Sequence, residues 1–546
     1  MKESRNPFRM RASEQSESDE NFVRLFSSRV LDILGDSTEG LFDRLRIFRS
    51  APGGGKTSLL RLFTPNALLT IRTIRERSND TKDLFQRLKQ LGALDESKIK
   101  VLGILLSCAR GFATLDELDI DLAKKKRLLL SLLNARIILA VLRSILVLKG
   151  LRYPETSALE QIEISFSIDT SSVGLTLPCS GKQLYDWACG VEQKVCDALD
   201  SFITPTDGLP GHDYLIALDI IKYPFILHAG QPITERVLLM LDDVHKLTWE
   251  QRRFLREELI DNRLPVGIWM AERLEALGVE ELLSEGAIIG RDHEGVINLE
   301  AFWRGNRRFE GVVKNIADCR VREAADTDIE SFNGCLQNSL DGEKWQNKFA
   351  EGKLIVSERV RSSADQKQRY IQWVSEREQQ EGTEKDNAIA WKTLEILIDR
   401  EERKPYKQLT IFDLPLEVDE LEKRDDSQVR AAAELFFCKE FKIPYYYGIS
   451  RLANIASSNI EQFLWLTGSL FEVSLSAALL KQPCALPPNQ QQQILKQAVE
   501  QRWNTLPQQV KYGHDVRKFL EAIGELSKWE TNRPNAPYAP GVTVGC

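Results

Sequence analysis

One feature constrains the fold of this chain more than any other: a strand-like segment runs into a glycine-rich loop and then into a helical pattern, over residues 44–63. The segment RLRIFR carries Leu45, Ile47 and Phe48, and it breaks at SAPGGG. The following KTSLLRLF has apolar residues at helical spacing. We therefore expect a strand, a loop and a helix in direct succession, as in an α/β sheet.

Further strand and helix patterns alternate over the first 300 residues. Strands are predicted at 100–108, 162–169, 236–244, 264–271 and 295–300, and helices at 66–94, 113–150, 181–202, 212–222, 248–261 and 273–284. After residue 300 the strand patterns nearly vanish, and 487–493 is predicted to be a loop entering a helix. The fold class is thus α/β, a parallel sheet with covering helices, followed by a mostly α-helical C-terminal region.

Composition excludes several classes of protein. The 546 residues, 42% of them apolar, can bury a sizeable core, and the net charge of −7 gives no overall basic field for nucleic acid or anionic lipid. Nine cysteines without a CxxC pair indicate reduced thiols. The reduced cysteines lead us to expect a cytoplasmic location. The most apolar stretch, 127–151, contains Asn134, Arg136 and Arg143, so we expect a buried helix and no membrane association.

The loop SAPGGGKT, residues 50–57 and hereafter the phosphate loop, fits the Walker A pattern GxxxxGK[ST] except that Ser50 replaces its first glycine. Glycines let backbone N–H groups turn toward phosphate oxygens at the start of a helix. Lys56 is expected to reach the β and γ phosphates of ATP, and Thr57 to bind Mg2+. The expected nucleotide contacts are Ser50, Pro52, Gly53, Gly54, Gly55, Lys56, Thr57 and Ser58. The alternative is a glycine-rich turn without a ligand.

A second candidate element is LLMLDDV, about 185 residues after the loop. It reads as a buried strand that ends in two acids. Asp242 is expected to hold the magnesium ion, as in a Walker B strand, and Asp243 to orient the attacking water. The alternative is that two acids simply cap the end of a strand.

These motifs resemble P-loop ATPases of the AAA+ class, specifically the origin-recognition-type initiator ATPases and their bacterial relatives, over about residues 20–320. The resemblance implies an arginine before the last core strand that reaches the γ phosphate in a neighbouring subunit, and Arg291 has that place. An ordinary surface arginine is the alternative. It also implies a polar sensor at the end of the preceding strand, where this chain has Ala271, with Glu272 as a stand-in.

Residues 452–472 look like the helical lid segment that bears a second sensor in this family. The arginine expected near Asn459 is absent, because Ile460 and Glu461 stand there, and Arg451 is a distant substitute. Family members that turn over quickly usually carry Glu as the second strand acid, so the shorter Asp243 implies slow hydrolysis.

The predicted organisation is an entry segment at 1–43, an ATPase core at 44–310 with long insertions at about 66–230, and a charged helical region at 311–428. A lid-like helical domain follows at 429–530, and a proline-rich tail at 531–546. The ending APGVTVGC has the pattern of an approach to another strand, so a C-terminus shorter than the natural one is one interpretation.

The leading hypothesis is an ATP-dependent molecular switch that uses Mg2+, hydrolyses ATP slowly, and acts on a protein partner or as a homo-oligomer. The resemblance alone associates it with a bacterial defence or mobile-element system. One alternative is an initiator-like ATPase that binds DNA. The basic run at 124–127 and a small basic excess at 481–546, eight Lys or Arg against five Asp or Glu, allow it without establishing it. Another alternative is a pseudo-ATPase scaffold with a structural nucleotide.

Overall fold

The structure is a computed structural model of the whole chain, in which a defined set of residues is described. These are 6–9, 18–35, 40–165, 170, 173–201, 208–261, 266–276, 293–304, 308–322, 329–365, 370–402 and 427–531. The chain forms two compact units. The first comprises Met1–Ala324 with Ser458–Leu464, and the second comprises Ala325–Ser457 with Trp465–Cys546.

A five-stranded sheet in the order β2-β7-β8-β1-β9 forms the centre of the first unit. The strands are β1 (Leu45–Ser50), β2 (Val101–Ser107), β7 (Arg236–Asp242), β8 (Gly267–Arg273) and β9 (His293–Asn298). All neighbouring pairs are parallel, which confirms the predicted α/β class. Because β8 lies between β1 and β7, the carboxyl ends of these three strands share one edge, where ligands bind in such sheets.

Several predicted boundaries were wrong at strand ends. Strand β8 continues through Arg273, where a helix was predicted to begin, and a 3-10 turn, Leu274–Ala276, follows it. The rest of that predicted helix lies outside the described residues. Strand β9 ends before Leu299, because α11 (Leu299–Arg304) begins there. These strands are short apolar runs flanked by helices, for which periodicity alone does not locate the ends.

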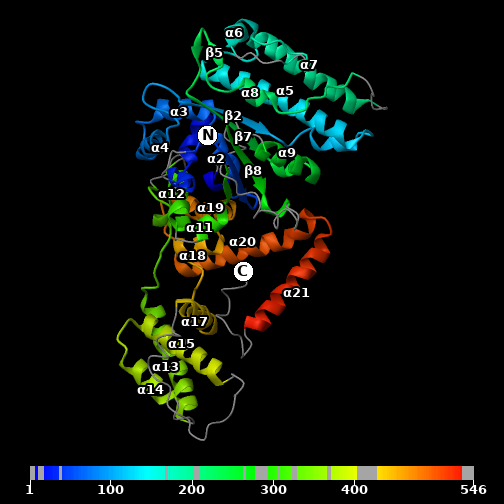
Figure 1. Ribbon diagram of the computed structural model, residues 1–546. Helices are drawn as coiled ribbons and strands as arrows, with labels where there is room; N and C mark the ends of the chain where they lie inside the picture. The colour runs from blue at the N-terminus through cyan, green and yellow to red at the C-terminus, as the bar shows by residue number, and fades with distance from the viewer. Residues whose placement is uncertain are drawn as a thin grey trace. The chain divides into compact units, whose positions relative to one another are not determined.

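Helices cover the sheet of the first unit, as Figure 1 shows. They are α1 (Asp19–Leu25), α2 (Lys56–Leu62), α3 (Pro65–Ile74), α4 (Asn79–Gln90), α5 (Leu122–Leu148), α6 (Thr156–Glu160), α7 (Gly181–Asp200), α8 (Ile216–Ile220), α9 (Trp249–Asp261), α11 and α12 (Arg308–Arg322). The part of the chain that follows α5 and precedes β7 contributes a small antiparallel sheet in the order β4-β3-β5-β6. Its strands are β3 (Ile162–Ile164), β4 (Cys179–Ser180), β5 (Ile226–His228) and β6 (Gln231–Pro232), so the strand predicted at 162–169 is described only at its start.

The apolar stretch that begins at residue 127 lies in α5, which contacts β2 and α7. By length and composition α5 is the one helix among the described residues that could cross a membrane, yet 72% of its most apolar window is buried in the protein. The prediction of a buried helix is therefore confirmed. Within it, Asn134 donates to His212 and to the carbonyl oxygen of Tyr214 and accepts from the amide of Ala217, so its polar side chain is satisfied.

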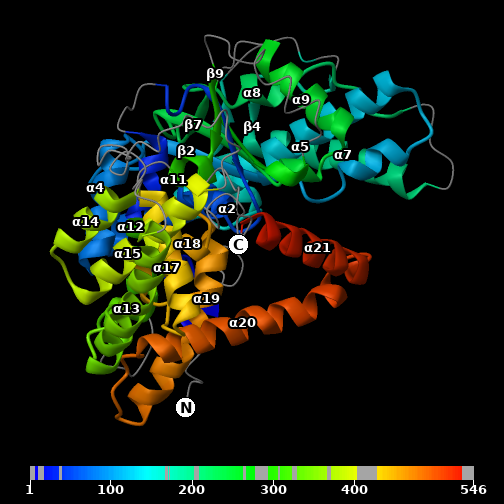
Figure 2. The ribbon, with the colours of Figure 1, turned by 90° about the horizontal axis from the view of Figure 1, so that it is seen from below.

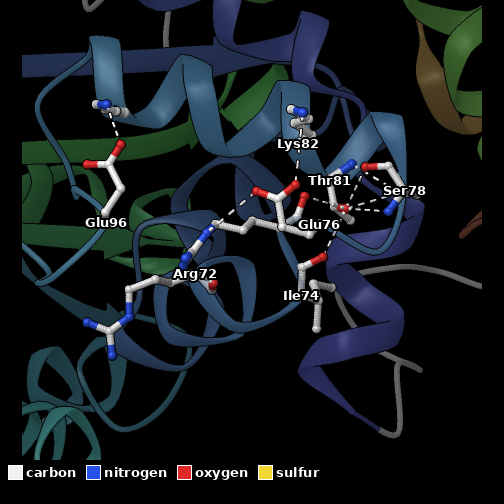
Figure 3. A network of polar contacts seen from close by, with 9 residues as sticks. Arg72, Ile74, Glu76, Ser78, Thr81, Lys82 and Glu96 are labelled. Carbon is white, nitrogen blue, oxygen red and sulfur yellow. Dashed lines mark hydrogen bonds and ion pairs between the residues drawn. The ribbon is translucent and has the colours of Figure 1, made fainter.

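Helix α4 begins at a capping box, shown in Figure 3. The hydroxyl of Ser78 accepts from the amide of Thr81, and the hydroxyl of Thr81 accepts from the amide of Ser78. The same Thr81 hydroxyl donates to the carbonyl oxygen of Ile74 at the end of α3. This exchange satisfies amides that the first turn leaves open and joins α3 to α4.

Glycine is required at Gly103 in the middle of β2. A Cβ atom there would lie 1.9 Å from the carbonyl oxygen of Phe63, at the end of α2. The missing side chain therefore lets α2 approach the sheet closely.

The second unit is helical. Its helices are α13 (Glu343–Asp365), α14 (Ile371–Gln379), α15 (Glu384–Glu402), α17 (Ser427–Glu440), α18 (Gly448–Ile455), the greater part of α19 (Ile460–Leu479), α20 (Pro488–Gln509) and α21 (Gly513–Thr531). Phe349, Trp373, Trp391 and Phe437 belong to its core. Figure 2 shows α21 turning back after α20. The loop predicted at 487–493 is wrong beyond Pro487, because Pro488 begins α20, a position that tolerates proline.

The eight cysteines that the structure describes are free thiols. The predicted tail at 531–546 lies outside the described residues except for Thr531, which ends α21.

Candidate functional site

The phosphate loop connects β1 to α2, as predicted, and glycine is needed at three of its positions. Gly53 and Gly55 have φ of 81° and 93°, a left-handed backbone that other residues rarely adopt. Gly54 is needed for space, because a Cβ atom there would lie 2.2 Å from Oγ of Ser50. The serine that replaces the first glycine of the motif is therefore packed inside the loop, where it is fully buried.

Lys56, the first residue of α2, folds its side chain back over the start of this loop. Its Nζ donates to the carbonyl oxygen of Ser50 at 2.8 Å, to Oγ of Ser50 at 2.6 Å and to the carbonyl oxygen of Ala51 at 3.1 Å. All three acceptors are neutral. Ser50 thus contributes a hydroxyl that the glycine of the usual motif lacks, and it holds the ammonium group at the mouth of the loop.

The pKa of Lys56 is lowered to about 8, chiefly because burial disfavours the charged form. The carboxylates of Glu275, Asp242 and Glu300 raise it, whereas the guanidinium of Arg273 lowers it further. A large share of the lysine is therefore charged near neutral pH, in a partly dehydrated place where an anion would interact strongly with it.

Thr57 and Asp242 meet across the sheet edge. The Thr57 side chain is hydrogen-bonded to the Asp242 carboxylate, which also accepts from the amide of Asp243 at 2.8 Å. Asp242 ends β7 and is only 6% exposed. Burial raises the pKa of this carboxyl, while the Thr57 hydrogen bond and the Lys56 charge oppose the rise. Residues predicted from two distant motifs are thus in direct contact.

Asp243 turns away from the strand. Its φ of 56° and ψ of 30° place it in the left-handed region, in which non-glycine residues are uncommon. Its carboxylate accepts from the hydroxyl of Ser107 at 3.4 Å and lies 3.9 Å from Nε2 of His245. Burial lowers the pKa of His245 to about 4, so the imidazole is neutral at pH 7. The left-handed backbone of Asp243 thus ends the regular alternation of side chains directly after Asp242, the last residue of β7.

Glu272 has a different environment from the one expected of a sensor. The residue is fully buried, and its carboxylate accepts from Nε of Arg49 at 2.5 Å and from Nη2 of Arg256 at 2.6 Å. Both arginines are themselves buried. The interpretation of Glu272 as a stand-in sensor is therefore not supported, because both oxygens serve an internal ion pair. Ala271 is buried and has no polar side chain.

Arg273, the next residue, was not among the site residues predicted from the sequence. In the strand register it is paired with Ser50, the first residue of the phosphate loop. Its side chain is half-buried, and its charge lowers the pKa of Lys56 and of His245. The signal that could have found it is its position at the carboxyl end of a strand next to β1.

A distant segment of the first unit, Ser458–Leu464, lies against the phosphate loop. Nδ2 of Asn459 donates to the carbonyl oxygen of Pro52 at 2.8 Å, and the amide of Glu461 donates to that of Gly53 at 3.2 Å. From another side, the amide of Ala51 donates to Oε1 of Glu300 at 2.9 Å. Although no arginine stands near Asn459, the predicted lid segment still contacts the loop.

Two other predicted residues, Arg291 and Arg451, are not among the described residues of this site. Arg291 lies outside the described residues. In the second unit, the guanidinium of Arg451 donates to Glu434 and to the hydroxyl of Tyr445, over whose ring it also lies. Ser58 lies in the first turn of α2.

The donors at the sheet edge fit a magnesium ion. Mg2+ prefers oxygen ligands and is usually held by one or two carboxylates together with substrate phosphates. The Thr57 hydroxyl and the Asp242 carboxylate supply such oxygens side by side. Among the described residues, no group of three or more His, Cys, Asp or Glu could hold a metal without further ligands.

Comparison with known proteins gives one finding of family. The model of a family described as ORC-CDC6-like matches residues 6–543. A comparison with curated proteins finds no match, and a comparison with solved structures finds none either. The matched range includes the phosphate loop, both strand acids and the segment that lies against the loop.

Proposed function

Because this chain belongs to the ORC-CDC6-like family, the origin-recognition-type AAA+ ATPases, we propose that it binds ATP with Mg2+ and hydrolyses it slowly as a nucleotide-dependent switch. The observation that carries the proposal is the contact between Thr57 and Asp242, in an edge that also holds Lys56. A glycine-rich turn without a ligand would not require a buried carboxylate beside that threonine. We further propose a cytoplasmic location, which the free thiols support.

Each side chain would contribute a separate interaction. Lys56 would exchange its neutral acceptors in the loop for phosphate oxygens, a charge-assisted contact stronger than those it makes here. Thr57 and Asp242 would hold Mg2+, whose charge would neutralise the phosphates. Asp243 would orient the attacking water, and its short side chain supports slow turnover. Arg291 is proposed to act on the γ phosphate bound in a neighbouring copy, so the proposed partners include a second copy of this chain.

Steady-state ATP turnover at a series of Mg2+ concentrations tests this assignment. Asp242→Asn is expected to raise the Mg2+ concentration for half-maximal turnover by at least about ten- to a hundredfold, because even outer partners of a metal site contribute that much. As a control, Asp186→Asn on α7 removes an exposed acid that pairs with Lys182 and should change nothing. Equal Mg2+ dependence of Asp242→Asn and the wild type would exclude the metal role. ADP that purifies with the chain and never exchanges would favour the scaffold hypothesis.

The lowered pKa of Lys56 gives a pH prediction. Since this pKa is about 8, the charged fraction falls as pH rises above 8, and ATP affinity should fall with it, by up to about tenfold per pH unit. The measurement is calorimetric titration of ATP between pH 7.5 and 9.5. Lys56→Arg, which stays charged over this range, is the control and should give a flat profile. Parallel profiles for the two proteins would show that Lys56 does not set the pH dependence.

Family membership also supports DNA binding as a second candidate function. The basic run at 124–127 begins near the N-terminus of α5, where Lys124 pairs with Asp121 and Arg127 with Asp213. These internal partners reduce the charge available for phosphates. If duplex DNA binds, its affinity should fall steeply with salt, and a binding signal independent of salt would argue against this candidate.

A further inference from the structure

Helices α20 and α21 of the second unit form a hairpin, residues 488–531, that exposes many apolar side chains. The large ones are Val499, Val510, Tyr512, Phe519, Leu520, Ile523 and Leu526. These seven are close to half of the sixteen large apolar side chains that are exposed on the described residues, although the hairpin is a small part of the chain. Such a concentration of exposed apolar surface is typical of an interaction site.

The apolar residues of α21 lie on one face of the helix. Positions 516, 519, 520, 523 and 526 recur at spacings of three and four, as on a helix that faces a protein core. The charged residues of the same stretch fall on the opposite side, and they are Arg517, Lys518, Glu521 and Glu525. Phe519 is 66% exposed and Leu526 is 58% exposed. Helix α21 therefore has the pattern of a buried helix, but its apolar face is open.

Helix α20 carries a second apolar stripe, which consists of Val499, Trp503, Leu506 and Val510. The stripe faces α21, because the guanidinium of Arg517 lies over the ring of Trp503, 5.5 Å from its centroid. Trp503 and Leu506 are half-buried, whereas Val499, farther from the turn, is 51% exposed. Helix α21 thus covers this stripe only in part.

The two helices are close where they connect and separate beyond that point, as Figure 2 shows. A Cβ atom on Gly513 would lie 2.2 Å from the carbonyl oxygen of Pro507, so the chain is tight at the turn. A Cβ atom on Gly524, about three turns along α21, would meet nothing within 4 Å. Within the described part of the chain, α20 is the one element with which α21 has an extended contact. The hairpin therefore leaves room for further helices against both stripes.

The charges beside the open face favour a protein as its occupant. Between residues 516 and 527 two cations balance two anions, and Arg517 pairs with Glu521 at 3.0 Å. Nucleic acid or an anionic lipid surface would call for an excess of basic residues along this face. A second copy of the hairpin offers an equally uncharged apolar stripe, so two-fold pairing would bring no like charges together.

The exposed area is sufficient for a pair of identical chains. If each of the seven side chains exposes on the order of 100 Å², one copy offers about 700 Å² and two copies about 1,400 Å². Specific protein interfaces bury about 1,200 to 2,000 Å² in total. The hairpin alone therefore reaches the size that a stable dimer needs.

We propose that two copies of this chain associate through the α20–α21 hairpin, with the apolar stripes of one hairpin packed against those of the other in a four-helix bundle. The association needs no nucleotide and does not rest on the proposed function. It also differs from the contact proposed for Arg291, which acts at a nucleotide in a neighbouring copy.

Sedimentation velocity of the full chain without nucleotide, over a series of concentrations, tests the proposal. The wild type is expected to reach twice the mass of the single chain by about 10 µM. The double variant Phe519→Glu, Leu526→Glu should raise the dissociation constant of the dimer at least about a hundredfold, because like charges would meet in an apolar contact. Leu354→Glu in α13 is the matched control, since Leu354 is also 58% exposed, and it should leave the dimer unchanged. Circular dichroism checks that each variant is folded.

A mixing experiment tests whether the partner is a second copy. The double variant Phe519→Lys, Leu526→Lys should also be a single chain, and mixing it with the double glutamate variant should restore a dimer with one copy of each. Two variants that stay single in the mixture would show that the hairpins do not face each other.

Three further results would overturn the proposal. A wild type that stays a single chain up to about 100 µM would exclude a second copy as the occupant. Unchanged dimerisation of the glutamate variant would place the contact elsewhere. A dimer that forms only with MgATP and is lost in Lys56→Ala would belong to the nucleotide site. If the wild type dimerises as expected but binds no nucleotide, the proposed function fails and this inference stands.

Discussion

Lys56→Ala is expected to weaken ATP binding about ten- to a hundredfold, because a charge-assisted hydrogen bond to phosphate contributes about 1.5 to 3 kcal/mol. We also expect a specific result for the stability of this variant without nucleotide. The Lys56 ammonium is desolvated and its charge-neutral acceptors lie within the loop, so its removal should leave the melting temperature without nucleotide nearly unchanged. The stabilisation that saturating ATP adds to the wild type should then be largely lost.

Melting curves of the wild type and the variant, with and without MgATP, measure both effects. Lys82→Ala in α4 is the matched control, because the Lys82 side chain is 59% exposed and its Nζ forms only a long ion pair, 3.9 Å, with Glu76. That variant should keep the full ATP-dependent shift. A full shift in Lys56→Ala would contradict the assignment of the phosphate loop, whereas a collapse of the protein without nucleotide would indicate a structural role.

Glu272→Gln is expected to destabilise the first unit by about 3 to 5 kcal/mol, the usual cost of removing one partner from a buried ion pair. The fully buried carboxylate lies between the guanidinium groups of Arg49 and Arg256, which are also buried. Without its charge, two desolvated cations would repel each other across β8. Urea unfolding followed by circular dichroism measures the change, and because the chain has two units, each transition is fitted separately.

Two further variants test whether the loss of stability comes from the buried ion pair of Glu272. Glu257→Gln removes an acid that is 54% exposed and pairs with Arg253 on α9, and it should cost no more than about 1 kcal/mol. Replacing Glu272 together with both arginines by leucine or methionine should recover much of the loss, since a well-packed apolar set can replace a buried ion pair. Unchanged stability of Glu272→Gln with impaired ATP turnover would instead restore the sensor interpretation.

The sequence predicted the fold of the first unit well where patterns are local. The five strands of the parallel sheet were expected near their observed positions, since each is a short apolar run flanked by polar or helical sequence. Boundaries failed where strand and helix follow without a break, as at Arg273 and Leu299. Of the antiparallel sheet only β3 was predicted, as the start of a strand at 162–169. The other strands, β4, β5 and β6, are two or three residues long and carry almost no pattern.

In the candidate site, too, the residues of local motifs could be predicted from the sequence. Gly53, Gly55, Lys56 and Thr57 could be recognised from the sequence, because the conformation of a tight loop depends on neighbouring residues. The pairing of Thr57 with Asp242 was inferred from motifs some 185 residues apart, and the structure brings the two side chains together.

Only the tertiary structure distinguished Glu272 from Arg273. The two residues are adjacent and both charged, so no sequence pattern states which one enters an internal ion pair. Their roles depend on the order of strands in the sheet, which puts Arg49 and Arg256 against Glu272 and sets Arg273 beside Ser50. Local sequence thus determined the loop and its chemistry. The contacts between strands distant in the chain decided which charges are buried in pairs and which lie at the site, because burial and pairing are properties of the packed sheet.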